Sequence, residues 1–146
     1  MRVPHNSYIL VADGKKMLFF RNEGDEQFPK LEVDRKEEHS NPPTRDQKTD
    51  ESGRTFSSAG TAHHAYSETD FHQLEEDRFA AEAAEMLKQR ALRNDFENLI
   101  VVAPPRTLGE LRKHYHKEVE KRLSGEVAKD LTGHPVTEIE KILRLQ

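Results

Sequence analysis

The sequence predicts a single α/β domain over residues 1–146, with a five-stranded mixed sheet flanked by helices. The first observation is the continuous apolar run Leu99–Ala103, which is typical of a strand buried on both faces. Pro104 and Pro105 end this run because proline cannot donate to a sheet ladder. The second observation is the order of the elements, βββαβαβα, which favours a mixed sheet covered by helices. A chain of 146 residues is of the size expected for one domain.

The amino-terminal part predicts an antiparallel meander of three strands. Ser7–Ala12 has the composition of a central strand, and Lys16–Arg21 follows as the second. Asp13-Gly14 between them is a tight-hairpin signal, since glycine readily adopts a positive φ. Phe28–Lys36 alternates weakly and predicts a more exposed third strand. We expect the first strand to lie in the centre of the sheet, parallel to Leu99–Ala103.

A long polar segment, Glu37–Thr69, interrupts this pattern. It contains Pro42-Pro43 and many short polar residues, and it has no apolar periodicity. A connection of about 30 residues exceeds the usual length and is normally functional or disordered. We expect the 37–69 loop to be mobile, because its composition offers little apolar area to offset the entropy of ordering it. It is interpreted either as a linker without a specific task or as a partner-binding segment.

Helical periodicity follows from about Thr69 to Arg93. One face of this predicted helix is apolar (Phe71, Phe79, Ala83, Met86, Leu87), and the other is charged (Glu75, Glu76, Arg78, Glu82, Glu85, Lys88). The helix should therefore cover one face of the sheet.

The remaining elements follow the Leu99–Ala103 strand. Thr107 and Glu110 form a capping-box pattern, which predicts a helix over Thr107–Glu118. Lys121–Ala128 predicts a fifth strand, weakened by a glycine. Pro135 at a first helical position predicts a last helix with an apolar stripe (Val136, Ile139, Ile142, Leu143).

Composition excludes several classes of function. The net charge of −4 is incompatible with a uniformly basic nucleic-acid binder, although a local basic patch remains open. The absence of cysteine excludes disulfides, thiolate metal sites and a cysteine nucleophile. The amino-terminal apolar run, Tyr8–Ala12, is too short for a signal peptide, and no run approaches a membrane span. We therefore expect a cytoplasmic protein without a membrane partner.

The histidines do not form a metal-binding pattern. There are eight, but His63 and His64 are adjacent in the polar loop. His114 and His116 would lie about 200° apart around a helix axis. No metal and no cofactor are therefore expected. Asp13 leaves two interpretations open: a residue of its own turn, or a metal carboxylate of a nuclease or hydrolase, assisted by Glu75 or Asp130.

Basic residues gather after the Leu99–Ala103 strand. Arg106 stands at the carboxyl end of that strand, where ligands of α/β sheets tend to bind. The other members follow it closely (Arg112, Lys113, Lys117, Lys121, Arg122), and glutamates dilute them (Glu110, Glu118, Glu120). This pattern fits a phosphate-binding surface. It fits a solvated helix surface equally well.

Several segments carry a resemblance to a known family: SYILVADGKKMLFFR, DFHQLEEDRFAAEAAEML, VVAPPRTLGELRKHYHKEV and KDLTGHPVTEIEKIL. They resemble the bacterial host attachment protein family, whose members are described as required for attachment to host cells. That family is similar to the middle domain of archaeo-eukaryotic peptide-chain release factors, a fold similar to ribonuclease H. In those factors a long loop carrying Gly-Gly-Gln precedes the main helix and reaches the ribosomal catalytic centre.

The resemblance implies an intracellular module that contacts RNA or the ribosome and affects attachment indirectly. The layout is similar, since a loop with Gly53-Arg54 precedes a helix containing Arg78-Phe79, but the chain has no Gly-Gly-Gln. A non-enzymatic role is therefore expected, with no catalytic residue. The candidate nucleic-acid contacts are Arg54, Arg106, Arg112, Lys113 and His116. The alternatives are a metal-dependent nuclease or hydrolase using Asp13, and a protein-interaction module acting through the 37–69 loop.

Overall fold

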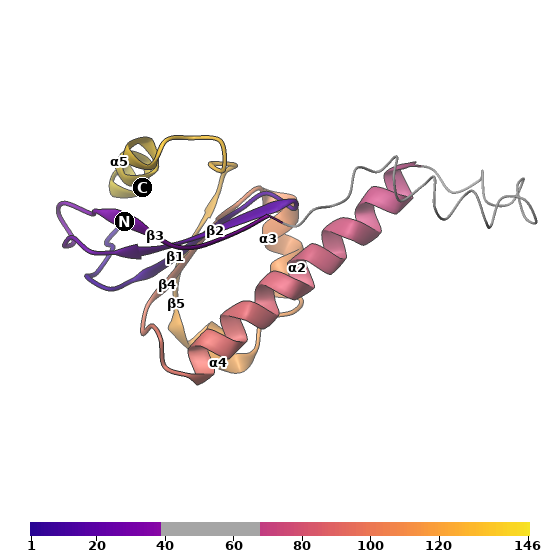
Figure 1. Ribbon diagram of the computed structural model, residues 1–146, viewed down its shortest axis with the longest axis horizontal. Helices are drawn as coiled ribbons and strands as arrows, with labels where there is room; N and C mark the ends of the chain where they lie inside the picture. The colour runs from indigo at the N-terminus through magenta and orange to yellow at the C-terminus, as the bar shows by residue number, and fades with distance from the viewer. Residues whose placement is uncertain (39–67) are drawn as a thin grey trace, which may run out of the picture.

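The computed structural model describes residues 1–38 and 68–146 (Figure 1). Within these ranges β3 runs to Glu38 and α2 begins at Glu68, so the sheet and the helix each extend slightly into the predicted loop. The expectations for residues 39–67, including loop mobility and the role of Arg54, lie outside the described residues.

The described residues form one five-stranded mixed sheet, with the strand order β3-β2-β1-β4-β5. β1 (Tyr8–Ala12), β2 (Lys16–Asn22) and β3 (Leu31–Glu38) form an antiparallel meander. β4 (Leu99–Ala103) pairs in parallel with β1, and β5 (Leu123–Ala128) pairs in parallel with β4. This arrangement confirms the predicted α/β class, with the first strand in the centre and parallel to Leu99–Ala103.

The central pair β1–β4 is buried along its whole length. Every residue of both strands is buried, and their register places Tyr8 opposite Leu99 and Val11 opposite Val102. Successive side chains alternate between the two faces of the sheet, so both faces need a cover. This requirement explains why the two strands are continuous apolar runs.

Helices cover both faces, as predicted (Figure 1). On one face lie α2 (Glu68–Leu92), α3 (Pro105–Arg112) and α4 (Lys117–Arg122), and on the other lies α5 (Val136–Leu145). The first core contains the buried stripe of α2 (Phe79, Ala83, Leu87) and the second contains that of α5 (Ile139, Leu143). Within the described residues, no helix is both long enough and apolar enough to cross a membrane.

The predicted helix Thr107–Glu118 is wrong at both ends. α3 begins two residues earlier, with Pro104 as its N-cap and no side-chain capping bond, so the predicted capping box does not form. Pro105 explains the early start, because its fixed φ suits the first helical position, where an N–H is not needed. A turn follows Arg112, and α4 is a separate helix capped by His116. It extends through Arg122, which delays the fifth strand to Leu123.

Two further expectations need correction. The third strand begins at Leu31 rather than at Phe28, because the Asp25 carboxylate accepts the N–H groups of Gln27 and Phe28 and holds this segment in a turn. Glu75, expected on the charged outer face of the long helix, is only 4% exposed.

A largely buried polar cluster joins α2 to the central strand β1 and to the edge strand β3. Arg90 of α2 is 8% exposed, and its guanidinium lies 2.5 Å from the Asp34 carboxylate of β3. The Tyr8 hydroxyl of β1 donates to Asp34 and accepts from Arg90. Arg90 also lies over the ring of Phe19, 4.8 Å from its centroid. Asp34 is the additional residue of a β-bulge opposite Phe19 and Phe20. A bulge changes the direction of the side chain at the extra residue, which is consistent with the contact of Asp34 with Arg90.

We predict that Asp34→Ala lowers the free energy of unfolding by about 3 kcal/mol, since it leaves the buried Arg90 charge without its carboxylate. Urea denaturation measures this loss. The control is Glu32→Ala on the same strand, whose exposed ion pair with Lys30 predicts a change within about 0.5 kcal/mol. Equal stability losses in the two variants would contradict a supporting role for the cluster.

Candidate functional site

The carboxyl ends of β1 and β4 bring the β1–β2 turn close to the start of α3. Gly14 has a φ of +102°, as the turn requires, and a Cβ atom at this position would lie in van der Waals contact with Glu76 and Thr107. Glu76 of α2 reaches this end of the sheet and pairs with Arg106, with 3.5 Å between Oε2 and Nε. Arg106 therefore does stand at the strand end, where the sequence predicts it. Its side chain is 61% exposed.

Asp13 is engaged in the turn itself. Its Oδ1 accepts the N–H groups of Lys15 and Lys16, both at 2.8 Å, and its Oδ2 accepts the Thr132 hydroxyl at 3.0 Å. This geometry matches the interpretation of Asp13 as a turn residue. Over residues 1–38 and 68–146 there is no group of at least three His, Cys, Asp or Glu side chains placed to hold a metal ion.

Arg112, at the end of α3, forms a two-pronged pair with Glu126 of β5. Its Nε and Nη2 donate to Glu126 Oε1 at 3.0 and 2.6 Å. The hydrogen bond and the charge of this carboxylate raise the pKa of Arg112. The pair ties α3 to the edge strand β5, while the arginine side chain remains more than half exposed.

The turn between α3 and α4 positions the next candidates. Lys113 pairs with Glu110 one helical turn earlier, at 3.1 Å. His116 caps α4, because its Nδ1 accepts the N–H of Glu118 at 3.0 Å. A ring nitrogen that accepts this bond carries no proton, so in this arrangement only Nε2 of the ring can donate.

Glu118 forms ion pairs with two cations of α4. It pairs with Lys121 at 3.0 Å and with Arg122 at 3.5 Å. The hydrogen bond and the charge of Lys121, followed by those of Arg122, lower the pKa of Glu118. Arg122 also donates to the carbonyl of Phe96, which anchors α4 to the loop before β4.

These contacts define a basic strip that runs from the end of β4 along α3 to α4, and its members are Arg106, Arg112, Lys113, His116, Lys121 and Arg122. The structure gathers the predicted candidates on neighbouring elements, except Arg54, which lies outside the described residues. Each arginine and lysine of the strip has a carboxylate partner. A phosphate bound here would therefore compete with glutamates that are already in place.

The sequence does not reveal the partners that position this strip. Its helical pattern places Glu76 on the charged face of α2, and Glu126 lies in a weakly predicted strand. Tyr115 also escaped notice as a polar group: its hydroxyl is buried with no hydrogen-bond partner, and burial followed by the Glu126 charge raises its pKa. The missed ion pairs join segments distant in sequence, and only the strand and helix packing brings them together.

The chain belongs to bacterial archaeo-eukaryotic release factor family 12, whose family model matches residues 6–143. The match covers every strand and nearly every helical residue described above, so the predicted release-factor-like resemblance is confirmed. No curated protein shows significant similarity to this chain.

We predict that Asp13→Ala lowers the free energy of unfolding by about 1–2 kcal/mol, because two backbone N–H groups and a hydroxyl lose their acceptor. Thermal or urea denaturation measures the loss. In the unchanged protein, added magnesium should leave the amide NMR signals around Asp13 in place. Magnesium-induced shifts centred on Asp13 would instead favour the metal-dependent enzyme.

The lowered pKa of Glu118 predicts an acid-sensitive contribution to stability. A carboxylate whose pKa is lower in the folded state than in the unfolded state stabilises the fold at every pH above its usual pKa of 4.5. This contribution is lost as the pH falls through the lowered pKa. Glu118→Gln should therefore lose less stability than the unchanged protein on acidification. Melting temperatures measured from neutral pH to well below 4.5 test this, with Glu120→Gln on the same helix as the control. Parallel acid losses in the unchanged protein and Glu118→Gln would refute it.

Proposed function

We propose that this protein is a release-factor-like module that associates with RNA or the ribosome in the cytoplasm and does not hydrolyse peptidyl-tRNA. Any effect on attachment to host cells, which the resemblance in the sequence suggests, is then indirect. The proposal rests on one observation above all: a member of a release-factor family presents exposed basic side chains next to the carboxyl end of its central strand.

The ion pairs of the basic strip are compatible with phosphate binding. The pair of Arg106 with Glu76 lies at the surface, where such pairs contribute about 0–1 kcal/mol, so exchanging Glu76 for a phosphate has a low energetic cost. Glu126 beside Arg112 is only 19% exposed, so displacing it costs more. A guanidinium has five N–H donors, and one carboxylate partner occupies only some of them. Arg106 and Arg112 are more than half exposed and keep donors for a second anion. The glutamates nevertheless reduce the net field, which favours weak, salt-sensitive binding.

The lack of an enzymatic step is proposed from the sequence. The release-factor resemblance assigns hydrolysis to a Gly-Gly-Gln loop, and this chain contains no such tripeptide. A shared scaffold without the reacting loop supports binding rather than hydrolysis. The family membership alone therefore carries no activity to this chain.

The decisive experiment is co-sedimentation with ribosomes at low and high salt. Three proteins are compared: the unchanged chain, a chain lacking residues 39–67, and the double variant Arg106→Ala/Arg112→Ala. We expect the unchanged chain to co-sediment at low salt and to dissociate at high salt, and the double variant to bind weakly. An additional Arg54→Ala variant tests the candidate contact within the deleted segment.

The outcomes separate the competing functions. Failure of all three proteins to co-sediment at low salt would overturn the proposal. Binding that survives Arg106→Ala/Arg112→Ala but disappears with residues 39–67 would move recognition to that segment, as a protein-interaction module requires, and would refute a role for the basic strip.

We predict that Arg106→Ala reduces the slope of log affinity against log salt for RNA by about 0.7–0.9, the value of one lost phosphate contact. The melting temperature should hardly change, because Arg106 is exposed and its pair with Glu76 is a surface pair. Fluorescence anisotropy with a labelled RNA over a range of salt measures the slope, with Lys88→Ala, which removes a partly exposed cation of α2, as the control. An unchanged slope together with a large loss of stability would assign Arg106 a purely structural role.

A further inference from the structure

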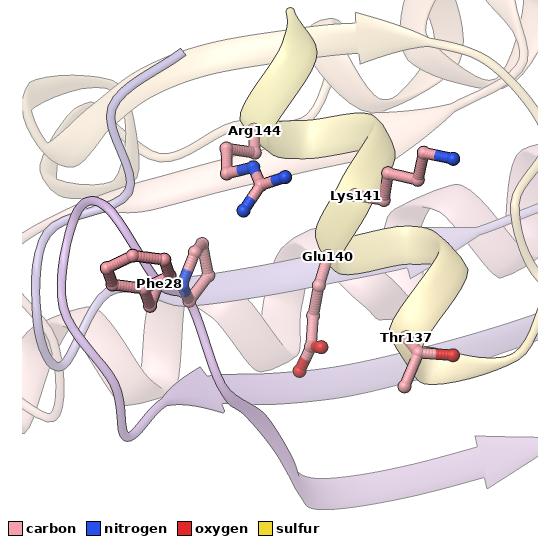
Figure 2. A pocket seen from close by; sticks show the side chains of 6 residues that line it. Phe28, Thr137, Glu140, Lys141 and Arg144 are labelled. Carbon is pink, nitrogen blue, oxygen red and sulfur yellow. The ribbon is translucent and has the colours of Figure 1, made fainter.

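A hollow of about 250 Å³ lies between the β2–β3 loop and α5 (Figure 2). Helix α5 lies on the face of the sheet opposite α3 and α4, which carry the basic strip (Figure 1). Phe28 and Pro29 line it from the loop, and the helix contributes four side chains at a helical spacing (Thr137, Glu140, Lys141, Arg144). Its volume is below the range typical of pockets for drug-sized ligands, so it suits a smaller ligand or one unit of a chain.

Phe28 is presented to solvent by a firmly held turn. The Asp25 carboxylate accepts the N–H of Phe28 at 2.7 Å, and the Asp25 N–H donates to the Phe28 carbonyl at 3.2 Å. Gly24 lies so close to the Phe28 carbonyl and to Lys30 that a Cβ atom would not fit without a shift. The ring is 67% exposed, so its apolar area adds little to folding and is available to a ligand.

The cations of α5 differ from those of the basic strip. Over the part of the chain that the structure describes, neither Lys141 nor Arg144 forms an ion pair, whereas Arg106 and Arg112 both do. Figure 2 shows the Arg144 side chain beside the loop that carries Phe28, while Lys141 extends toward the other side of the helix. Of the two cations of α5 that line the hollow, Arg144 thus lies on the side of the Phe28 loop and Lys141 lies farther from it.

The floor of the hollow provides acceptors as well. Glu140 reaches from α5 to the edge strand, where its Oε2 accepts the N–H of Leu31 at 2.7 Å. This bond fixes the carboxylate and leaves Oε1 to accept from a ligand. Thr137, one turn earlier, offers a hydroxyl that both donates and accepts.

We propose that this hollow binds a nucleotide, either free or as one unit of a single-stranded RNA. The base stacks on Phe28, as bases do on exposed aromatic rings of single-strand binding proteins. Arg144, with Lys141 as a second cation, binds the phosphate. Glu140 and Thr137 accept from a base amine or from ribose hydroxyls. A simple aromatic acid would satisfy the ring and the arginine but would have no donor for Glu140.

The test is an NMR titration of the full chain with AMP, adenosine and inorganic phosphate, each added separately. AMP should shift the amide signals of residues 25–31 and 137–145, and it should bind more tightly than adenosine or phosphate. Phe28→Ala and Arg144→Gln should each weaken AMP binding about fivefold or more, because the first removes the ring that stacks on the base and the second removes the cation that binds the phosphate. Both residues are exposed, and melting temperatures verify that the variants remain folded.

Matched controls are available in the same chain. Leu92→Ala removes an exposed apolar side chain elsewhere, and Lys117→Ala removes a cation on α4; neither should alter AMP affinity. Tetra-adenylate distinguishes a free nucleotide from a unit of single-stranded RNA as the natural ligand. If tetra-adenylate binds much more tightly than AMP, the ligand is an RNA strand, and if the two bind equally, it is a free nucleotide.

The proposal is overturned if AMP shifts signals elsewhere or none at all, or if phosphate alone matches AMP. It is equally overturned if Phe28→Ala or Arg144→Gln binds AMP as well as the unchanged chain. The site does not rest on the proposed ribosome association, because neither Arg106 nor Arg112 lines the hollow. Loss of ribosome binding in Arg106→Ala/Arg112→Ala together with unchanged AMP binding would separate the two surfaces.

Discussion

The parallel pairing of β1 with β4 is the constraint on which the rest of the molecule depends. Because both strands are buried over their full length, each face of the sheet must be covered, and α2, α3 and α4 cover one face while α5 covers the other. The same pairing places the carboxyl ends of the two strands together. The turn at Asp13 and the first turn of α3 therefore meet there, and Arg106 takes its position from this geometry.

Electrostatic contacts then distinguish the two faces. On the α2 side many charges are paired, from the buried Arg90 with the partly exposed Asp34 to the exposed Arg112 with the partly buried Glu126. Such pairs hold elements together, and they also moderate the attraction of the basic strip for phosphate. On the α5 side the last helical turns carry cations without ion-pair partners in the described chain, beside an exposed aromatic ring. The two proposed binding surfaces therefore differ in chemistry as well as in position.

The sequence predicts the sheet better than it predicts the site. Continuous apolar runs such as Leu99–Ala103 indicate burial on both faces directly, so the predicted bounds of the central strands and of their neighbours β2 and β5 lie within two residues of those in the structure. The ends of the helices are harder to predict, because single residues decide between alternative starts. Pro105 starts α3 early, and His116 caps a new helix where the pattern favours a continuous one. The partners of the basic strip were not predictable, because Glu126 faces Arg112 only after β5 has paired with β4.

The central claim is that the basic strip along α3 and α4 faces RNA. Ultraviolet cross-linking of the ribosome-bound protein, with the attached peptides mapped by mass spectrometry, tests this contact directly. We expect RNA attached to peptides from residues 104–122, and loss of these cross-links in Arg106→Ala/Arg112→Ala. Stable association with ribosomes that yields RNA cross-links only outside residues 104–122, with the pattern unchanged in that variant, would contradict it.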